Sequence, residues 1–370
     1  MEREESYETF LPLLLAWALL CGCGTDQPAS SQGPAAGDTQ YFFAMDTLMS
    51  ITAYDGDTAA ALVAAQQEIN RLEALWSRTR PESDVSRLNA HAGDGTAVPI
   101  QPETAGLLET AAAAARESGL AFDPVLAPVM DAWGFGLTES EATAVHRVPG
   151  QEELSALLPL TRDLPQAAAL EDGSYAAALP LAGQAVDLGG IAKGASAAYV
   201  VDALTAHGVE NAILSLGGNI TALGHRPDGQ PFRVLVTDPL DSEESYLCTI
   251  ALGGGLTCST SGGYERYFTS GGGAYHHIID PATGYPAQSG MLSVTTVAAD
   301  PALADAWSTA LFVLGLDRAL ELWRTGEGTV AGMELILVTE DQRIYVTQGL
   351  EEGLQLHGEE TGYTYEIVRR

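Results

Sequence analysis

The second half of the chain contains many short strand-like segments with few residues between them. Runs of apolar and β-branched residues bounded by glycine and aspartate turns indicate strands. Short connections favour antiparallel pairing, because parallel strands need a long crossover. The predicted strands are Ala212–Leu216, Ile220–Leu223, Phe232–Thr237, Tyr246–Leu252, Leu256–Thr260 and Leu292–Ala298, followed by a closing hairpin of Met333–Val338 and Arg343–Thr347.

Helix signals dominate the first half of the chain. Asp57 caps an apolar-periodic helix that reaches about Trp76, and Pro102–Ser118 forms an alanine-rich helix. Tyr41–Tyr54 is strand-like and interrupted midway. Residues 138–181 are rich in Ala, Glu and Pro and poorly periodic, so we expect an inserted helical excursion with little chemistry. The predicted fold class is α+β, with antiparallel strands and helices packed around them.

The N-terminus has the features of a lipoprotein leader. An apolar run, Phe10–Leu20, is too short for a comfortable membrane span and suits a signal-peptide core. It leads into Leu20-Cys21-Gly22-Cys23, which looks like a bacterial lipobox with Cys23 as the lipid-carrying residue. The acidic segment Met1–Glu8, with four glutamates and one arginine, does not fit a signal peptide, because export signals begin with basic residues. Either the true start codon lies elsewhere or the leader is unusual.

This leader predicts the domain organisation. Residues 1–23 are the expected signal peptide, and residues 24–40, rich in Ser, Pro, Gly and Gln, are the expected flexible tether. Residues 41–370 form the expected folded domain. A lipid on Cys23 would place that domain at the cell membrane, on its extracytoplasmic face.

Charge excludes one class of function and singles out one residue. The formal net charge of −32 argues against a nucleic-acid surface, because phosphate binding needs clustered cations. The chain has 17 basic residues, and Lys193 is its single lysine. A compact ammonium suits a phosphate or a buried carboxylate, although codon usage is an alternative cause of the arginine bias.

Cys248 and Cys258 lie in neighbouring strand-like segments. An extracytoplasmic location allows a disulfide, but the spacing does not indicate one, so we expect two free, buried thiols.

Two segments carry oxygen or amide groups suited to anions and cations. Val186–Gly194 contains a glycine turn at a helix start, where free amides and the helix dipole favour anions, a weak signal by itself. Asp305, Ser308 and Thr309 are spaced i, i+3 and i+4, so their oxygens share one helix face. This face predicts a site for a hard cation such as Mg2+. The alternative is a helix-start cap with hydroxyls bonded to backbone carbonyls.

A third segment, Tyr275–Pro286, ends a strand in a rigid turn. His276, His277, Asp280 and Thr283 gather there, and strand ends commonly carry chemistry. The alternative is a half-buried strand with one histidine in the core and a polar turn.

Several spaced motifs together resemble the FAD:protein FMN transferase (ApbE) family. The resemblance runs from about Tyr41 to Val346 and covers most of the chain. Its blocks are Met45-Asp46-Thr47, Ser83–Asn89, Ala121-Phe122-Asp123 with Trp133-Gly134-Phe135, Asp187–Gly194, Ser215–Asn219, Ser261–Tyr267, His277–Pro286 and Ala304–Thr309.

The resemblance implies a Mg2+-dependent reaction in which FAD is cleaved, FMN is attached to a Thr or Ser hydroxyl of a partner protein, and AMP is released. It also implies two lobes around a flavin cleft. The expected acceptors are exported or membrane subunits with an Asp-x-Ala-Thr/Ser-like sequence, such as those of Rnf-type complexes or sodium-translocating quinone reductases. Two alternatives are an FAD pyrophosphatase that yields FMN and AMP, and a flavin-binding lipoprotein without turnover.

The resemblance also assigns roles to residues. His277 is the preferred base or transition-state stabiliser over His276, and Asp280 is a further candidate for taking the proton. Asp280 could instead orient or cap its turn. Lys193 would stabilise phosphate charge. Metal ligands would be the Gly190 carbonyl with Asp305 and Thr309, and Ser308 lies close by. Flavin contacts carry over to Met45, Thr79, Ala121, Phe122, Asp123, Asp187, Lys193 and Ile279.

Two positions depart from the family pattern. Asp46 stands where many relatives have glycine, so the local backbone is expected to differ. Thr79 stands where relatives can have an aromatic residue, which puts a stacking role there in doubt.

Overall fold

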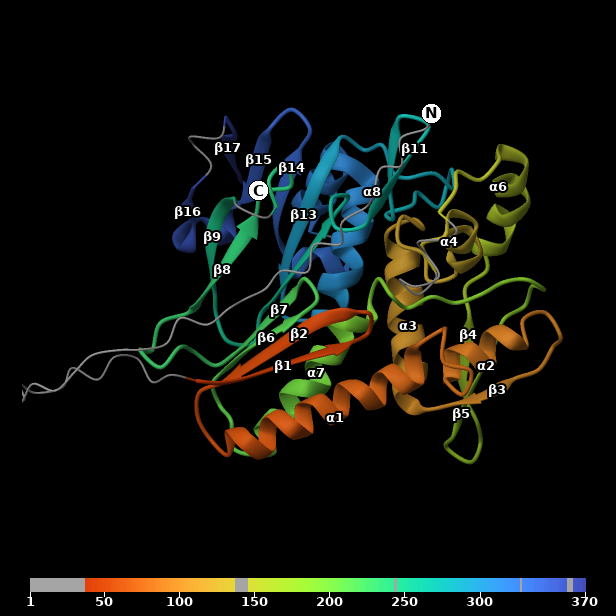
Figure 1. Cartoon of the computed structure of the whole chain (residues 1–370), viewed down its shortest axis with the longest axis horizontal. Coiled ribbons are helices and arrows are strands. Elements are labelled where there is room, and N and C mark those ends of the chain that lie inside the picture. Colours follow the sequence, from red (N-terminus) through yellow and green to blue (C-terminus); the bar gives the residue numbers. More distant parts are fainter. Residues whose placement is uncertain (1–36, 137–145, 243–244, 327, 358–361) are drawn as a thin grey trace, which may run out of the picture. The chain divides into compact units, whose positions relative to one another are not determined.

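The computed structural model describes residues 37–136, 146–242, 245–326, 328–357 and 362–370 (Figure 1). The expected signal peptide, Cys23 and most of the expected tether lie outside these residues. The first strand already begins at Asp38, so the folded part starts earlier than the predicted boundary at residue 41. The described residues from position 37 onward form one compact unit. Among the described residues, no helix combines the length and apolar character needed to span a membrane.

A nine-stranded sheet forms the centre of this unit, and its neighbouring strands are antiparallel except for the last pair. The α+β prediction is thus confirmed. The last strand, Thr364–Val368, runs parallel to Arg343–Thr347, so the predicted closing hairpin does not end the sheet. In sheet order, the strands are β1 (Asp38–Ala44), β2 (Thr47–Ala53), β6 (Ala212–Leu216), β7 (Asn219–Leu223), β10 (Thr257–Gly262), β13 (Met291–Ala298), β14 (Glu334–Thr339), β15 (Arg343–Thr347) and β17 (Thr364–Val368).

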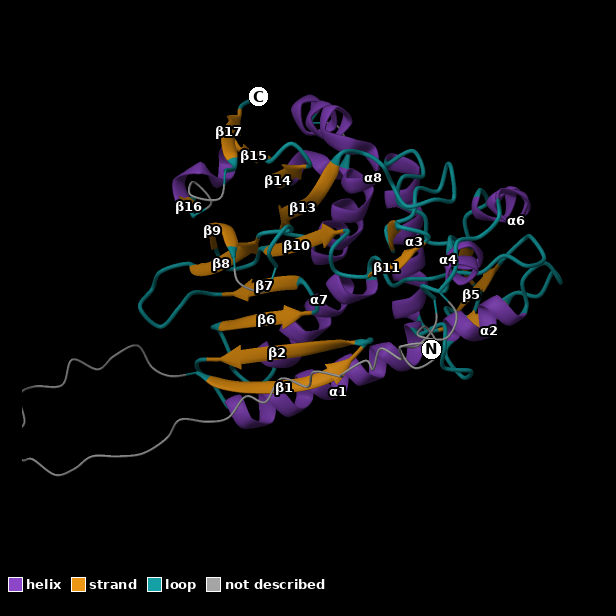
Figure 2. Ribbon diagram, turned by 45° about the horizontal axis from the view of Figure 1, so that its top comes forward, coloured by secondary structure: helices purple, strands orange, loops and turns teal. Residues whose placement is uncertain are grey.

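Three helices pack on one face of this sheet: α1 (Thr58–Trp76), α7 (Ala192–Thr205) and α8 (Pro301–Thr325) (Figure 2). Asp57 caps α1 by accepting a hydrogen bond from the Ala60 amide, as predicted. The α8 helix was expected to end near Gly315. It continues to Thr325, but Gly315 has φ 77° and interrupts the helical backbone there.

The opposite face of the sheet is covered by a three-stranded sheet of β8 (Phe232–Thr237), β9 (Tyr246–Leu252) and β16 (Gln355–Leu356), with the 3-10 helix η3 (Gln348–Gly353). Strand β14 shows how the two cores are divided. Leu335 and Leu337 pack with the helices, whereas Ile336 and Val338 pack with β8 and β9. This alternation follows from the two-residue period of a strand.

Cys248 and Cys258 are free and buried in the core beneath β8 and β9, which confirms the predicted thiols. Burial raises the pKa of both thiols to about 12, so both stay protonated at neutral pH and are poor nucleophiles.

The remaining elements form a smaller layer beside the helices. The predicted helical insertion at residues 138–181 is only partly correct, because its described part also contains two strands. One of them, Tyr175–Ala178, pairs with the strand Val98–Ile100, and the other, Gln166–Ala169, pairs with the first. This tertiary pairing overrides the helix preference of their alanines. The elements are α2 (Asp84–Ala90), β3 (Val98–Ile100), α3 (Pro102–Glu117), α4 (Ala127–Trp133), α6 (Gln151–Leu157), η1 (Leu158–Thr161), β4 (Gln166–Ala169), β5 (Tyr175–Ala178), the hairpin of β11 (Tyr267–Ser270) and β12 (Gly273–His276), and η2 (Thr329–Gly332).

Candidate active site

The starts of α7 and α8 touch at Gly194 and Asp305. The Gly194 amide donates a hydrogen bond to Asp305 Oδ2 at 2.8 Å, and the Asp305 side chain is buried. A Cβ atom at position 194 would lie 2.1 Å from the carbonyl oxygen of Pro301 and 2.6 Å from Asp305 Cβ. Glycine is therefore required for this approach of the two helices. The contact joins the predicted anion-binding turn to the predicted metal carboxylate.

The hydroxyls of the predicted metal face form a small cluster with a residue of β10. Ser261 Oγ lies 2.7 Å from Ser308 Oγ and 3.1 Å from Thr309 Oγ1. The Ser308 hydroxyl also donates a hydrogen bond to the carbonyl of Asp305 at 2.7 Å. This is the contact expected from the alternative in which the helix hydroxyls bond to backbone carbonyls. Ser261 lies in a recognised motif, but sequence reasoning gave it no role. Its contacts tie β10 to the face formed by Ser308 and Thr309.

The glycine turn before α7 follows an isolated bridge between Leu126 and Ala185, so the strand expected before this turn is only a single bridge. Lys193 Nζ donates to the carbonyl of Gly189 at 3.1 Å, and its side chain is half-buried. The Gly190 carbonyl accepts no hydrogen bond within the described residues. That carbonyl is thus available to a ligand close to Lys193.

The donor set fits a hard cation. Mg2+ prefers oxygen ligands, and the predicted set offers one carboxylate, two hydroxyls and the Gly190 carbonyl. Asp305 Oδ1 has no hydrogen-bond partner in the part of the chain that the structure describes, so one carboxylate oxygen is free for coordination. Across the same residues there is no group of three or more His, Cys, Asp or Glu side chains suited to a metal. A site here would therefore depend on hydroxyl, carbonyl and substrate oxygens.

The turn between β1 and β2 carries the predicted flavin contact Met45. Met45 and Asp46 have φ values of 48° and 59°, a left-handed conformation that glycine adopts most easily and aspartate tolerates. This conformation explains the frequent glycine at position 46 in the family pattern. Asp46 is exposed and lies 3.5 Å from a guanidinium nitrogen of Arg266. Met45 itself is half-buried against both helix-side cores.

Asp123 holds an unpaired polar atom in the predicted flavin region. Its Oδ1 accepts a hydrogen bond from the Val125 amide at 2.8 Å, but its Oδ2 is buried without a partner among the described residues. Burial raises the pKa of Asp123 to about 7. The neighbouring predicted contacts, Ala121 and Phe122, are buried, and the Phe122 ring lies against Gly190, 3.1 Å from where a Cβ would be. Asp123 is thus placed to bind a polar edge of a ligand.

Asp187 has both carboxylate oxygens engaged inside the protein. Oδ1 accepts from the Gly189 amide at 2.8 Å, and Oδ2 lies 3.0 Å from Nε of Arg78. Arg78 also pairs with Asp131 and donates to the carbonyl of Gly136 at 2.8 Å. Sequence reasoning missed Arg78, although it precedes the candidate Thr79. Asp187 therefore organises the glycine turn, and Arg78 joins this turn to α4.

Thr79 and Ile279 lie apart from this cluster of contacts. Thr79 is exposed and its hydroxyl lies 3.0 Å from that of Ser77. Ile279 is buried in an apolar cluster with Trp133 and Leu154. The structure gives neither side chain a contact with the other predicted flavin residues.

The two adjacent histidines differ in environment. The amide and Nδ1 of His277 both lie near the carbonyl of Arg266, at 3.1 and 3.2 Å, and burial lowers the pKa of His277 to about 3. His276 Nε2 lies 3.2 Å from the carbonyl of Ala287, and its Nδ1 is buried without a partner in the described chain. Burial also lowers the pKa of His276. Both rings are therefore neutral at physiological pH.

Asp280 caps its own turn. Oδ1 accepts from the Ala282 amide at 2.8 Å, and Oδ2 accepts from the Thr283 hydroxyl at 3.2 Å. Of the roles predicted for Asp280, which are proton acceptor, orienting residue and cap, this geometry is that of a cap.

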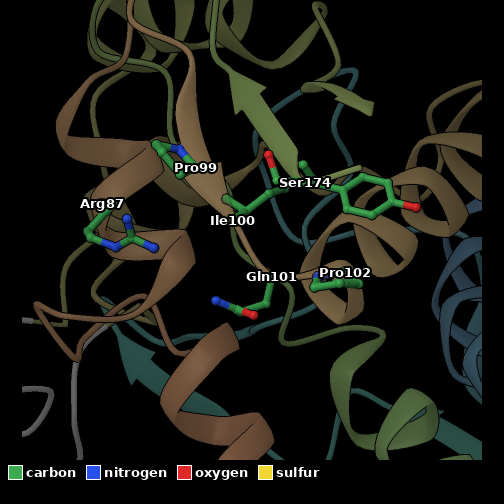
Figure 3. Close-up of a pocket in the computed structure, with 7 residues that line it drawn as sticks. Arg87, Pro99, Ile100, Gln101, Pro102 and Ser174 are labelled. Atoms are coloured by element: carbon green, nitrogen blue, oxygen red, sulfur yellow. The ribbon is translucent and has the colours of Figure 1, made fainter. Parts of the chain in front are cut away.

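A cavity of about 430 Å3 lies away from these residues (Figure 3). It opens between α2, β3 and the start of β5, and none of the predicted flavin, metal or catalytic residues lines it. Its one charged lining residue, Arg87, already pairs with Asp84. The chemistry-bearing side chains gather at α7, α8 and the loops around them, so we place the active site there. The cavity is lined by Arg87, Pro99, Ile100, Gln101, Pro102, Ser174 and Tyr175.

Comparison with known proteins bears on the predicted family. Residues 45–333 match the ApbE family. The FAD:protein FMN transferase of Treponema pallidum is 32% identical over 358 residues, which cover 91% of this chain and 93% of that protein. An FAD:protein FMN transferase of Klebsiella pneumoniae is 33% identical over 281 residues, covering 76% and 83% of the two chains.

Solved structures agree with this assignment. The ApbE protein of Thermotoga maritima superimposes with a TM-score of 0.72 at 29% identity, covering 89% of this chain and all of that one. The flavinyl transferase ApbE of Pseudomonas stutzeri gives a TM-score of 0.70 at 26% identity, and the match covers 84% of this chain and 93% of that one. The predicted family is confirmed, and the chain belongs to the ApbE family of FAD:protein FMN transferases.

Proposed function

We propose that this chain uses Mg2+ to transfer the FMN half of FAD to a Thr or Ser hydroxyl of an acceptor protein, with release of AMP. The family gives the flavin transferase activity, and the chain's own geometry supports the metal and phosphate roles. The contact between Gly194 and Asp305 carries the proposal, because it joins a metal-type carboxylate to a glycine turn with the single lysine.

The proposed metal ligands are Asp305, Thr309 and the carbonyl of Gly190, with Ser308 beside them. A bound Mg2+ would neutralise charge on the FAD pyrophosphate. The unpaired Asp305 Oδ1 and the unbonded Gly190 carbonyl are the observations that support this set.

Lys193 and the turn before α7 would hold the pyrophosphate. The Lys193 ammonium lies beside the Gly189 carbonyl at the N-terminal end of α7, where the helix dipole favours negative charge. Asp187 and Arg78 hold this turn in place through the Gly189 amide and α4. These residues orient the substrate, so an incoming hydroxyl meets a fixed phosphorus atom.

Met45, Ala121, Phe122 and Asp123 would contact the flavin, and the unpaired Oδ2 of Asp123 would bond a polar edge of the ring. At pH 7 this carboxyl is partly protonated, because its pKa is about 7, and it can donate as well as accept. Thr79 and Ile279 remain family-implied contacts.

We place the acceptor and the enzyme outside the cytoplasm. The lipobox at Cys23 supports a lipid anchor on the cell membrane, and the residues after it would act as a tether. The proposed acceptors are exported or membrane redox subunits with an Asp-x-Ala-Thr/Ser-like sequence, such as those of Rnf-type complexes or sodium-translocating quinone reductases.

One assay separates transfer from its alternatives. The folded part is incubated with FAD, Mg2+ and an acceptor domain, and flavin fluorescence is read after denaturing gel electrophoresis. A labelled acceptor with AMP release supports transfer. FMN and AMP without a labelled acceptor would establish hydrolysis instead, and FAD binding without either product would reduce the chain to a flavin-binding protein.

A further inference from the structure

Ser261, near the end of β10, contacts two residues of the proposed metal face but has no role in the proposed function. Its Oγ lies 2.7 Å from Ser308 Oγ and 3.1 Å from Thr309 Oγ1. Three hydroxyls from β10 and α8 therefore form one hydroxyl chain, Thr309–Ser261–Ser308. Which oxygen donates in each of its hydrogen bonds decides where the lone pairs of Thr309 point.

The direction of these hydrogen bonds follows from the group at the end of the hydroxyl chain. Ser308 Oγ lies 2.7 Å from the carbonyl oxygen of Asp305, and a carbonyl can only accept. A serine hydroxyl has one hydrogen, so Ser308 donates to this carbonyl and accepts from Ser261. The single hydrogen of Ser261 is then in use, so Ser261 accepts from Thr309. The hydroxyl chain therefore runs in one direction, from Thr309 to the backbone of Asp305.

This direction leaves the Thr309 oxygen suited to a cation. Its hydrogen points toward Ser261, and its side chain makes no other hydrogen bond within the described residues, so its lone pairs are free. A cation attracts lone pairs and repels a hydroxyl hydrogen. In the absence of Ser261, the Thr309 hydroxyl could turn to the carbonyl four residues earlier, as helix hydroxyls commonly do. Ser261 thus holds the hydrogen where it does not oppose a bound ion.

Ser308 and Thr309 differ in their access to a ligand. The Ser308 side chain is enclosed, with an exposed fraction of 0%, and its oxygen already accepts one hydrogen bond and donates another. Thr309 is half-buried and can reach a ligand. Asp305 takes part at both ends, because its carboxylate faces the proposed metal position and its carbonyl ends the hydroxyl chain. The two proposed side-chain ligands are therefore linked through Ser261 and Ser308.

We propose that Ser261 is a positioning residue that orients the Thr309 hydroxyl for Mg2+, and that Ser308 is the second link of the hydroxyl chain and not a metal ligand. Ser261 acts through Thr309, so it sets the affinity for Mg2+ and takes no part in bond making or breaking. This inference rests on the proposed function, because it requires Mg2+ at Asp305 and Thr309.

The test measures binding of Mg2+ alone to the full chain by calorimetry, without FAD, so the result does not depend on turnover. In Ser261→Ala the dissociation constant should rise by about 10- to 100-fold, the usual effect of removing a group that orients a metal ligand. Ser261→Thr keeps the hydroxyl and should recover most of the affinity. Thr260→Ala is the matched control, because it removes a hydroxyl of the same strand that pairs with Thr295 at 2.9 Å, and it should bind Mg2+ as the wild type does.

Ser308→Ala separates orientation from direct binding. It should weaken Mg2+ binding, because Ser261 is then free to donate its hydrogen to Thr309. The double variant should bind no more weakly than Ser261→Ala, since both changes break the same hydroxyl chain. Wild-type affinity in Ser261→Ala, or losses that multiply in the double variant, would overturn the proposal. Equal losses in Ser261→Thr and Ser261→Ala would also overturn it, because they would indicate packing and not the hydroxyl.

The dependence of AMP release on Mg2+ at saturating FAD gives a second readout. In Ser261→Ala the half-saturating Mg2+ concentration should rise as the dissociation constant does, and the rate at saturating Mg2+ should return to that of the wild type. A rate that excess Mg2+ does not restore would count against a role in metal affinity. Failure of the wild type to label an acceptor, with the expected pattern of Mg2+ binding, would contradict the transferase function and support the role of Ser261.

Discussion

The amide of Gly194 and the carboxylate of Asp305 are joined by a hydrogen bond of 2.8 Å between the starts of α7 and α8. Through this bond, one residue of the predicted anion-binding turn fixes the orientation of the predicted metal ligand. The second oxygen of Asp305 makes no hydrogen bond within the described chain. The same arrangement therefore orients the carboxylate and leaves one of its oxygens free to bind a metal ion.

Gly194→Ala should therefore disrupt the site. The added Cβ would lie 2.1 Å from a backbone oxygen of Pro301, so α7 and α8 must move apart. We expect a loss of about 1–3 kcal/mol in the free energy of unfolding, and loss of Mg2+-dependent FAD cleavage. Denaturant unfolding and AMP release measure the two effects.

Gly106→Ala provides the control for that change. Gly106 lies in α3, and a Cβ there meets nothing within 4 Å. This variant should be more stable than the wild type by about 0.4–1 kcal/mol and fully active. Equal activity of Gly194→Ala and Gly106→Ala would show that the close helix contact is not needed for the site.

Asp123→Asn should change how stability depends on pH. The pKa of Asp123 rises from an ordinary 3.8 to about 7 on folding, so folding favours its protonated form. The native state then binds more protons than the unfolded chain between about pH 4 and 7, and stability falls as pH rises through this window. Asparagine does not ionise, so the variant lacks this pH dependence. The Tm of the variant minus the Tm of the wild type should therefore be larger at pH 8 than at pH 5.

Thermal unfolding at both pH values checks this prediction, with Asp317→Asn, exposed on α8, as control. The Asp123 variant should also bind FAD about 10- to 100-fold more weakly if its buried Oδ2 bonds the flavin. A Tm difference that is the same at pH 5 and pH 8 would contradict the raised pKa of Asp123.

Arg78→Ala should loosen the turn that holds Asp187. Arg78 contacts Asp187, Asp131 and the carbonyl of Gly136, and its side chain is largely buried. We expect a loss of about 1–3 kcal/mol in stability, from the charged hydrogen bonds, and a rise in KM for FAD that exceeds the fall in kcat.

Arg80→Ala is the matched control, because Arg80 forms a surface ion pair with Glu73 that is worth at most about 1 kcal/mol. Steady-state kinetics with varied FAD and denaturant unfolding distinguish the two variants. Equal KM values for both would mean that Arg78 does not position the FAD site.

The sequence predicted those features that depend on residues close together in the chain, such as helix caps, side-chain spacing on a helix and individual strands. The spacing of Ser308 and Thr309 predicted neighbouring hydroxyls, and both contact Ser261. Short apolar runs identified most strands of the central sheet. The cap at Asp57 followed from the same kind of signal.

Features that depend on distant residues could not be predicted in this way. The pairs of Arg78 with Asp131 and Asp187 join segments far apart in the chain. The β5 strand pairs with β3, and β4 pairs in turn with β5, and this long-range pairing outweighs the helix preference of their alanines.

The most direct test of the account is the intact mass of an acceptor domain after reaction with FAD and Mg2+, with AMP measured in the same sample. Wild-type protein should add one FMN group to the acceptor and release AMP in equal amount, as should the control Asp317→Ala. Asp305→Ala should do neither, because the proposed Mg2+ site loses its only carboxylate. Full modification of the acceptor by Asp305→Ala, or an unmodified acceptor with the wild type, would contradict the account.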